Sequence, residues 1–394
     1  MSNDLTHVAI VLFVAFAGGL LLQYFRQPRL IGYILAGAFL GPSVLGLQAN
    51  DPTIHWLSEL GIILLMFMLG LELDISRFRK ALKPALLVAG LQIIAALGTM
   101  FALGFWLEWP WERAIILGFA AALSSTAVAM TTLRDLGELN SSAGRLSTAI
   151  LIAQDLAVIP MLLSIGVLQD GALSVNDITQ TALALTVIAL SLFGIFELHT
   201  HPQWLSRIEG ILTVGKRQPV IAGLALCFGA AALSGSLGLS TAYGAFALGL
   251  LIGNIGEIGA SYRHAITSLH DLLLMVFFLS VGLLLDLAFV LENALLIALI
   301  LVAVVLLKTA GNYFILRLLD IPQRSAMIIG ATLGQIGEFS FVIIALGLSS
   351  GFISGESYQI TLAVIALSLA LSPAWLSLVR ARLHIPEHYP KVNV

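Results

Sequence analysis

The chain has 394 residues, of which 59% are hydrophobic and only 10% are charged, and its formal net charge is −3. Soluble domains carry about 25% charged residues, so this composition indicates a polytopic helical membrane protein. The slightly negative net charge excludes the basic surface that a nucleic-acid partner requires. The single cysteine excludes a disulfide within the chain.

Hydrophobic runs follow one another along the whole chain without a long polar insert. A run of about twenty apolar residues is long enough to cross a bilayer as a helix. We therefore predict an all-α integral membrane protein, one membrane unit with thirteen spans. The spans cover, to within a few residues, 5–24, 29–47, 56–73, 84–107, 112–133, 144–168, 178–197, 217–234, 236–254, 268–286, 289–317, 325–348 and 358–379.

The positive charges predict the orientation of the chain. Of the 19 Lys and Arg residues, all but Arg113 and Lys308 fall in turns after odd-numbered spans or in the C-terminal tail. Positive residues accumulate on the cytoplasmic side of membrane proteins. We therefore expect the N-terminus outside and the C-terminus in the cytoplasm, which also requires an odd number of spans.

Asp155 is the most informative residue, because it lies in the middle of an apolar span, STAILIAQDLAVIPMLLSI. An aspartate at the centre of a membrane helix costs roughly 2.5–3.5 kcal/mol on insertion scales. A residue kept at that cost indicates a site on an ion or proton path. The alternative is a protonated Asp155 that makes a structural hydrogen bond to another helix.

Two other spans are interrupted by small and polar residues at mid-depth. Residues 112–133 contain Ser124, Ser125 and Thr126, and residues 325–348 contain several glycines together with Gln335 and Glu338. Interrupted spans at matching places in two halves of a chain point to a transporter site. The two spans are seven apart in order, so they run in opposite directions and predict an inverted repeat. Hydroxyls and unwound carbonyls there could replace the water shell of a cation.

Three further polar residues lie close to these features in the sequence or at similar depth. Gln154 is adjacent to Asp155, and Thr148 precedes Asp155 by two helical turns on the same face. Lys308 lies deep in span 289–317, where an ammonium group needs carbonyls, a carboxylate or a route to the interface. We expect Lys308 to neutralise the ends of the interrupted helices or to pair with an acid. The alternative is that it reaches the interface.

Several motifs, in order along essentially the whole chain, resemble the Kef potassium-efflux proteins of the monovalent cation:proton antiporter-2 family. These motifs are LGLELD, ALSSTAVAM, AQDLAVIP, RHAITSLHD and LGQIGEFSFV. The resemblance implies a sodium/proton antiporter-like fold with two crossed broken helices. It implies an ion-binding core formed by 84–168 and 289–379, and a scaffold formed by 1–83 and 178–286 that makes a homodimer.

The same resemblance implies roles for individual residues. Asp155 would bind the transported cation and the proton in alternation. Gln154 stands where electrogenic sodium/proton relatives carry a second acid or an Asn, which favours potassium and electroneutral exchange. The other core positions that match the family are Ser125, Thr126, Gln335, Glu338 and Lys308.

The resemblance also implies a setting for the chain. Kef proteins carry a cytoplasmic nucleotide-binding regulatory domain, which is missing from this sequence, so we expect no cofactor here beyond the transported K⁺ or Na⁺ and H⁺. The implied location is the bacterial inner membrane.

Other functions were weighed against potassium:proton antiport. A sodium:proton antiporter and a gated potassium channel could use the same fold. An intramembrane enzyme would need a second catalytic group at mid-depth, and all eight histidines lie in or near predicted loops or tails. We therefore expect that the protein is not an enzyme.

Overall fold

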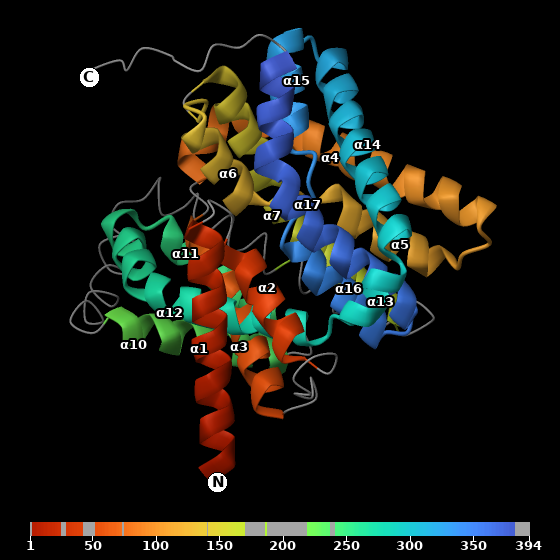
Figure 1. Ribbon diagram of the computed structural model, residues 1–394. Helices are drawn as coiled ribbons and strands as arrows, with labels where there is room; N and C mark the ends of the chain where they lie inside the picture. The colour runs from red at the N-terminus through yellow and green to blue at the C-terminus, as the bar shows by residue number, and fades with distance from the viewer. Residues whose placement is uncertain are drawn as a thin grey trace. The chain divides into compact units, whose positions relative to one another are not determined.

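The structure is a computed structural model that describes residues 2–24, 29–41, 52–72, 75–139, 141–169, 186, 219–236 and 241–382. Every regular element in these ranges is a helix, as predicted (Figure 1). The helices are α1 (Ser2–Tyr24), α2 (Arg29–Leu40), α3 (Pro52–Glu72), α4 (Ile75–Trp106), α5 (Trp111–Ala122), α6 (Thr126–Asp135), α7 (Ser142–Gln169), α10 (Pro219–Ser236), α11 (Thr241–Gly253), α12 (Gly256–Leu283), α13 (Leu287–Glu292), α14 (Ala294–Leu318), α15 (Gln323–Thr332), α16 (Phe339–Ser349) and α17 (Gly355–Arg382).

Six of the described helices are long and apolar enough to cross a bilayer unbroken. They lie within α4, α7, α10, α12, α14 and α17. Shorter apolar helices account for other predicted spans, and the predicted span 178–197 lies outside the described residues. The count of thirteen spans therefore stays a prediction.

One predicted turn is wrong. The predicted spans 236–254 and 268–286 leave a cytoplasmic turn between them that includes the start of the RHAITSLHD segment, but this whole segment, residues 263–271, lies inside α12. Its side chains at His264, Thr267 and Asp271 are largely exposed, while Ile266 is buried. The segment is thus amphipathic, and an amphipathic segment can extend an apolar helix without burying its polar groups.

The chain divides into two compact units. The first comprises Met1–Gly18, Tyr33–Arg79 and Gly166–Leu284. In it, α3 packs against α10, α11 and α12 (Figure 1). The core between these helices is aliphatic and aromatic, with Phe67 and Tyr262 among its fully buried side chains.

The second unit comprises Gly19–Gly32, Lys80–Ile165 and Leu285–Val394. Within it, α14 packs against α15 and α17, and α16 packs against α5 and α17. The roles predicted for the two parts of the chain, an ion-binding core and a dimerisation scaffold, stay predictions. All polar contacts of the interrupted helices described below lie within this second unit.

The first interrupted span consists of α5 and α6, joined by three residues without helical structure. Helix α5 follows Pro110, and Leu123 leaves the helix with an extended backbone, at φ −76° and ψ 148°. Ser125 then caps α6, since its hydroxyl accepts the backbone N–H of Val128 at 3.2 Å. A serine in this position supplies the acceptor that the first turn of a helix lacks. The SST sequence thus ends one helix and starts the next.

The second interrupted span has the same plan. Helix α15 follows Pro322, and residues 333–338 separate it from α16. Proline before both leading helices fits its fixed φ, which is suited to a helix start. The two spans therefore share proline, short helix, break and second helix, in that order.

The two breaks meet backbone to backbone. The N–H of Gly337 donates to the carbonyl of Leu123 at 3.1 Å. A Cβ atom added at Gly337 would lie 2.8 Å from the carbonyl carbon of Ser124 and 2.9 Å from its oxygen. Only a residue without a side chain fits against these backbone atoms, so Gly337 sets how closely the two broken helices cross.

We predict that Gly337→Ala lowers the thermal stability of the purified protein. The methyl group would press on backbone atoms that cannot rotate away, and overpacking of this kind costs roughly 1–3 kcal/mol. The midpoint of thermal unfolding in detergent, measured by the fluorescence of a thiol-independent dye, tests this.

Gly311→Ala in α14 is the matched control, because a Cβ at Gly311 meets nothing within 4 Å. Alanine favours a helix over glycine, so this variant should unfold at the wild-type temperature or slightly above it. Equal midpoints for the two variants would contradict the backbone crossing.

Candidate functional site

Asp155 is buried in the second unit, with 3% of its surface exposed. It lies on α7, and its Oδ2 atom accepts a hydrogen bond from the Thr126 hydroxyl at 2.8 Å. Thr126 is the first residue of α6. The N-terminus of a helix carries a partial positive charge, so the carboxylate is held beside a favourable field in a position shielded from water.

Gln154 is buried beside the same break and uses both ends of its amide. Its Oε1 atom accepts the backbone N–H of Ser124 at 2.9 Å. Its Nε2 atom donates to Oε1 of Gln92 on α4 at 2.7 Å. The residue predicted as an ion or proton ligand is thus placed as a brace between two helices and the break.

Gln335 and Ser125 join the two breaks by a reciprocal pair of hydrogen bonds. The Ser125 N–H donates to Gln335 Oε1 at 2.9 Å, and Gln335 Nε2 donates back to the Ser125 carbonyl at 3.0 Å. A side-chain amide can match a backbone peptide group in this way, since each has one donor side and one acceptor side. The pair replaces helical hydrogen bonds that the break at Ser125 removes.

Further polar contacts tie the breaks to neighbouring helices. The Ser124 hydroxyl donates to the Leu333 carbonyl at 2.9 Å, and Asn312 Nδ2 donates to the same carbonyl at 3.3 Å. The Ser340 hydroxyl donates to the Ala120 carbonyl at 2.7 Å. These contacts satisfy groups at the ends of the broken helices that would otherwise stay unpaired in an apolar interior.

Lys308 closes the end of α5. Its Nζ atom donates to the carbonyls of Ala121 and Leu123, each at 2.6 Å. The C-terminus of a helix carries a partial negative charge, which a nearby cation stabilises. The sequence left open whether Lys308 meets a broken-helix end, pairs with an acid or reaches the interface. In the structure its ammonium group lies at a broken-helix end, on backbone oxygens.

Thr148 and Glu338 are the two remaining supporting residues predicted from the sequence. The Thr148 hydroxyl donates to the Gly144 carbonyl in its own helix at 2.9 Å and lies 3.1 Å from Met130 Sδ. Glu338 directly precedes α16, next to Gly337, and its side chain is partly buried. The roles of Thr148 and Glu338 at the ion site stay predictions.

Several buried polar residues that support the site were not predicted from the sequence. Each interrupts an apolar span, which is the signal that pointed to Asp155, but amide and hydroxyl groups cost less than a carboxylate and stand out less. They contact the breaks or the helices beside them and are Gln92, Thr309, Asn312, Ser340 and Ser368.

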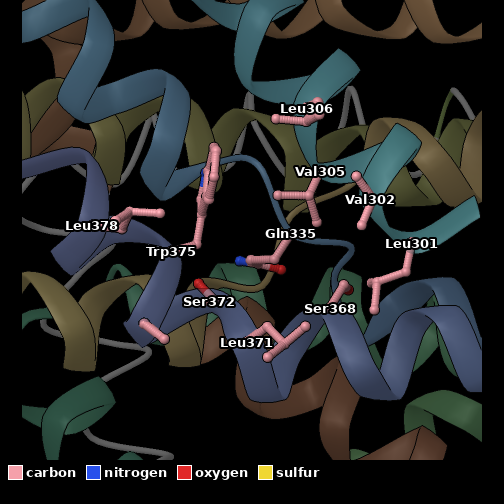
Figure 2. Close-up of a pocket in the computed structure, with 11 residues that line it drawn as sticks. Leu301, Val302, Val305, Leu306, Gln335, Ser368, Leu371, Ser372, Trp375 and Leu378 are labelled. Atoms are coloured by element: carbon pink, nitrogen blue, oxygen red, sulfur yellow. The ribbon is translucent and has the colours of Figure 1, made fainter. Parts of the chain in front are cut away.

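A cavity of about 250 Å³ lies between α14 and α17 and has Gln335 on its wall. Figure 2 shows Ser368, Ser372 and Trp375 on α17 around the Gln335 side chain, with leucine and valine side chains completing the lining. The amide that braces the breaks is therefore covered mainly by hydrocarbon, which strengthens its hydrogen bonds by excluding water.

The described ranges contain no group of three or more His, Cys, Asp and Glu side chains placed to hold a metal ion. What they bring together at the first break is the Asp155 carboxylate with hydroxyls and neutral amides, and Glu338 lies in the second break. Together with two interrupted helices that cross backbone to backbone, this arrangement is that of an ion-coupled secondary transporter.

Comparisons with known proteins agree with that class. The sodium/hydrogen exchanger transmembrane family matches residues 9–380. The iron transporter MagA of Paramagnetospirillum magneticum is 39% identical over 387 residues, covering 97% of this chain and 86% of that protein. The sodium proton antiporter MjNhaP1 of Methanocaldococcus jannaschii superposes with a TM-score of 0.69 at 14% identity, covering 98% of this chain and 99% of that chain.

The chain belongs to the sodium/hydrogen exchanger family, a family of monovalent cation:proton antiporters. It is an integral membrane transporter and not an enzyme, as the sequence predicted. The MjNhaP1 likeness shows that the fold is of the predicted antiporter type.

We predict that Lys308→Gln lowers thermal stability more than it changes transport. The shorter neutral amide cannot bridge both α5 carbonyls, and a buried carbonyl left without a donor costs about 1–3 kcal/mol. Thermal unfolding of the detergent-solubilised variant measures the loss.

Lys83→Gln, at an exposed position in α4, removes the same charge without a buried partner and should leave the midpoint unchanged. An unchanged midpoint for Lys308→Gln, with a strongly shifted pH profile of transport, would instead make Lys308 a titrating transport residue.

Proposed function

We propose that this antiporter exchanges potassium for protons by alternating access, as a Kef-type protein, with Asp155 binding the cation and the proton in turn. The single observation that carries the proposal is the buried Asp155 carboxylate, held by Thr126 at the start of a broken helix. A site that binds and releases a cation or a proton requires a carboxylate whose ionised form is unfavourable in the membrane unless one of these ions neutralises it.

One carboxylate supports an exclusive choice of load. An ionised Asp155 in apolar surroundings is neutralised either by a proton or by a cation, and both cannot occupy the same oxygens at once. The Thr126 hydroxyl lies on Asp155, and we propose the Ser125 hydroxyl as a second ligand; hydroxyl oxygens are hard ligands of the kind that alkali cations use. Each inward or outward movement of the core then carries either one cation or one proton, which gives exchange of one for the other.

The proposal of electroneutral exchange rests on Gln154. Its neutral amide occupies the place next to Asp155, and its oxygen is held by the Ser124 N–H. No second proton enters the cycle through a group that does not titrate. The resemblance to Kef proteins associates this position with potassium, and the preference for potassium is part of the proposal.

Sodium:proton antiport is the second candidate. The matching family is described as sodium/hydrogen exchanger, and the structural neighbour MjNhaP1 is a sodium proton antiporter. MagA is named an iron transporter, whereas the Asp155 carboxylate with a hydroxyl oxygen on it favours a monovalent cation. Comparing potassium, sodium and rubidium in one flux assay separates the first two candidates.

The setting of the protein is part of the same proposal. The distribution of Lys and Arg supports an N-terminus outside and a C-terminus in the cytoplasm of a bacterial inner membrane. The resemblance supports a homodimer.

We predict that Asp155→Asn abolishes cation:proton exchange while the protein stays folded. An amide keeps the size of the side chain but cannot take up and release a proton. Thermal stability should be equal or higher, because a buried charge is removed. Proton flux driven by potassium or sodium gradients in proteoliposomes measures the activity.

Asp320→Asn is the matched control in the same unit. Asp320 is exposed and has a positive φ of 58°, which Asn adopts equally well, so this variant should transport like the wild type. Exchange at the wild-type rate in Asp155→Asn would refute the assignment of the carrier.

We predict that exchange is insensitive to membrane potential and that the apparent cation affinity falls as the pH is lowered. The loaded core is neutral with either load, whereas a moved net charge would feel about 2.3 kcal/mol per 100 mV. Protons compete for the same carboxylate, so acid weakens cation binding. Flux in liposomes under potentials imposed independently of the potassium and proton gradients tests both statements.

A flux that rises steeply with the imposed potential would show that a second charge moves in each cycle, with Glu338 as the first residue to examine. Cation binding without release of a proton would contradict the single-carboxylate scheme.

A further inference from the structure

Ser124, Gln154 and Gln92 form a chain of two hydrogen bonds, here called the relay, and the direction of donation along it is fixed at the Ser124 end. A backbone N–H can only donate, so the Ser124 N–H requires an oxygen, and the Gln154 amide must turn its Oε1 atom toward it. Gln154 then presents its Nε2 atom, a donor, to α4. Gln92 must answer with its own oxygen, and it does so at 2.7 Å.

Each member of the relay is almost fully buried. Gln92 is 5% exposed, Gln154 is 1% exposed and Ser124 is 2% exposed. The Nε2 atom of Gln92 is also buried and makes no hydrogen bond within the described part of the chain. Leaving a buried amide NH₂ group without an acceptor costs free energy. Gln92 bears this cost while its oxygen is paired, which indicates that the hydrogen bond to its oxygen is the more important one.

We propose that Gln92 is a positioning residue for cation binding, which acts through Gln154 and Ser124 on the hydroxyl that holds Asp155. The structure assigns it this role because Gln92 accepts from the residue adjacent to Asp155, and that residue binds the break two positions before Thr126. The inference rests on the proposed function and deepens it. It adds α4 to the elements that define the ion site.

The relay keeps the Gln154 oxygen on the break. Without an acceptor on α4, the Gln154 Nε2 group would be left unpaired in an apolar interior, and the amide would turn or withdraw to satisfy it. The Ser124 N–H would then lose its partner, and the start of α6 would shift against Asp155. Cation affinity would fall, while the carboxylate that carries the load would remain.

The test compares three substitutions of Gln92 in the full-length protein. Gln92→Met has nearly the same length and lacks an acceptor, and Gln92→Asn keeps the amide but is one methylene shorter. Both should raise the apparent Kd for the cation by about tenfold, the order expected when a buried donor is left unpaired, with a smaller effect on the maximal exchange rate. Gln92→Glu offers an acceptor oxygen in either protonation state and should bind with wild-type affinity.

Affinity is read in two ways. One is the half-saturating potassium concentration for exchange in proteoliposomes. The other is the rise in unfolding temperature produced by potassium chloride over choline chloride at constant ionic strength, because a ligand that binds only the folded state stabilises it. Sodium chloride is run in parallel. Gln359→Met is the matched control, since Gln359 also accepts from a backbone N–H, that of Asp286 at 3.0 Å, but at an exposed position.

Weakened affinity in Gln92→Met or Gln92→Asn, with recovery in Gln92→Glu and no change in Gln359→Met, supports the relay. Wild-type cation affinity in Gln92→Asn, and in Gln92→Met where it folds, would overturn the relay. A loss of affinity in Gln92→Glu as large as in these variants would also overturn it. Should Gln92→Met not fold, Gln92→Asn and Gln92→Glu decide the matter. Wild-type exchange by Asp155→Asn would instead refute the proposed function, so the two failures are distinguishable.

Discussion

A helix that is interrupted inside a membrane must find new partners for the backbone groups that it exposes, because hydrocarbon offers none. The second unit meets this demand with side chains from several helices. Lys308 takes two carbonyls at the end of α5, Gln154 and Gln335 take the next two N–H groups, and Gly337 meets Leu123 directly. These contacts supply partners for the backbone groups that the break exposes, and the proposed ion site depends on them.

The charges follow from the same arrangement. The break creates a negative helix end at Leu123 and a positive helix end at Thr126, only three residues apart along the chain. Lys308 is bound at the first and Asp155 at the second. The two side chains of opposite charge are therefore directed to different backbone dipoles, one on each side of the break.

The sequence predicted the helical class and the two interruptions, because a charge or a cluster of small residues is conspicuous in an apolar run. The antiporter fold was implied by the resemblance to Kef proteins. The sequence did not predict which donor would meet which acceptor. The reciprocal bonds between Ser125 and Gln335 join residues 210 positions apart, and no local pattern encodes such a pair. Gln92 was not predicted as a site residue because a single amide is a weak signal in a span. The span predicted from residue 268 begins too far along the chain, because the first turns of α12 are amphipathic and not uniformly apolar.

The second unit is assembled from stretches that are far apart in the order of synthesis, since residues 166–284 belong to the first unit. When a ribosome has completed α5, α6 and α7, the donor of Lys308 and the amide of Gln335 have not yet been made. The early half must therefore wait in the membrane, or at its insertion machinery, without the donor for the Ala121 and Leu123 carbonyls. The later helices then supply the missing hydrogen-bond partners and stabilise the earlier ones. A chain that stops before α14 would lack these partners and would be a substrate for quality control.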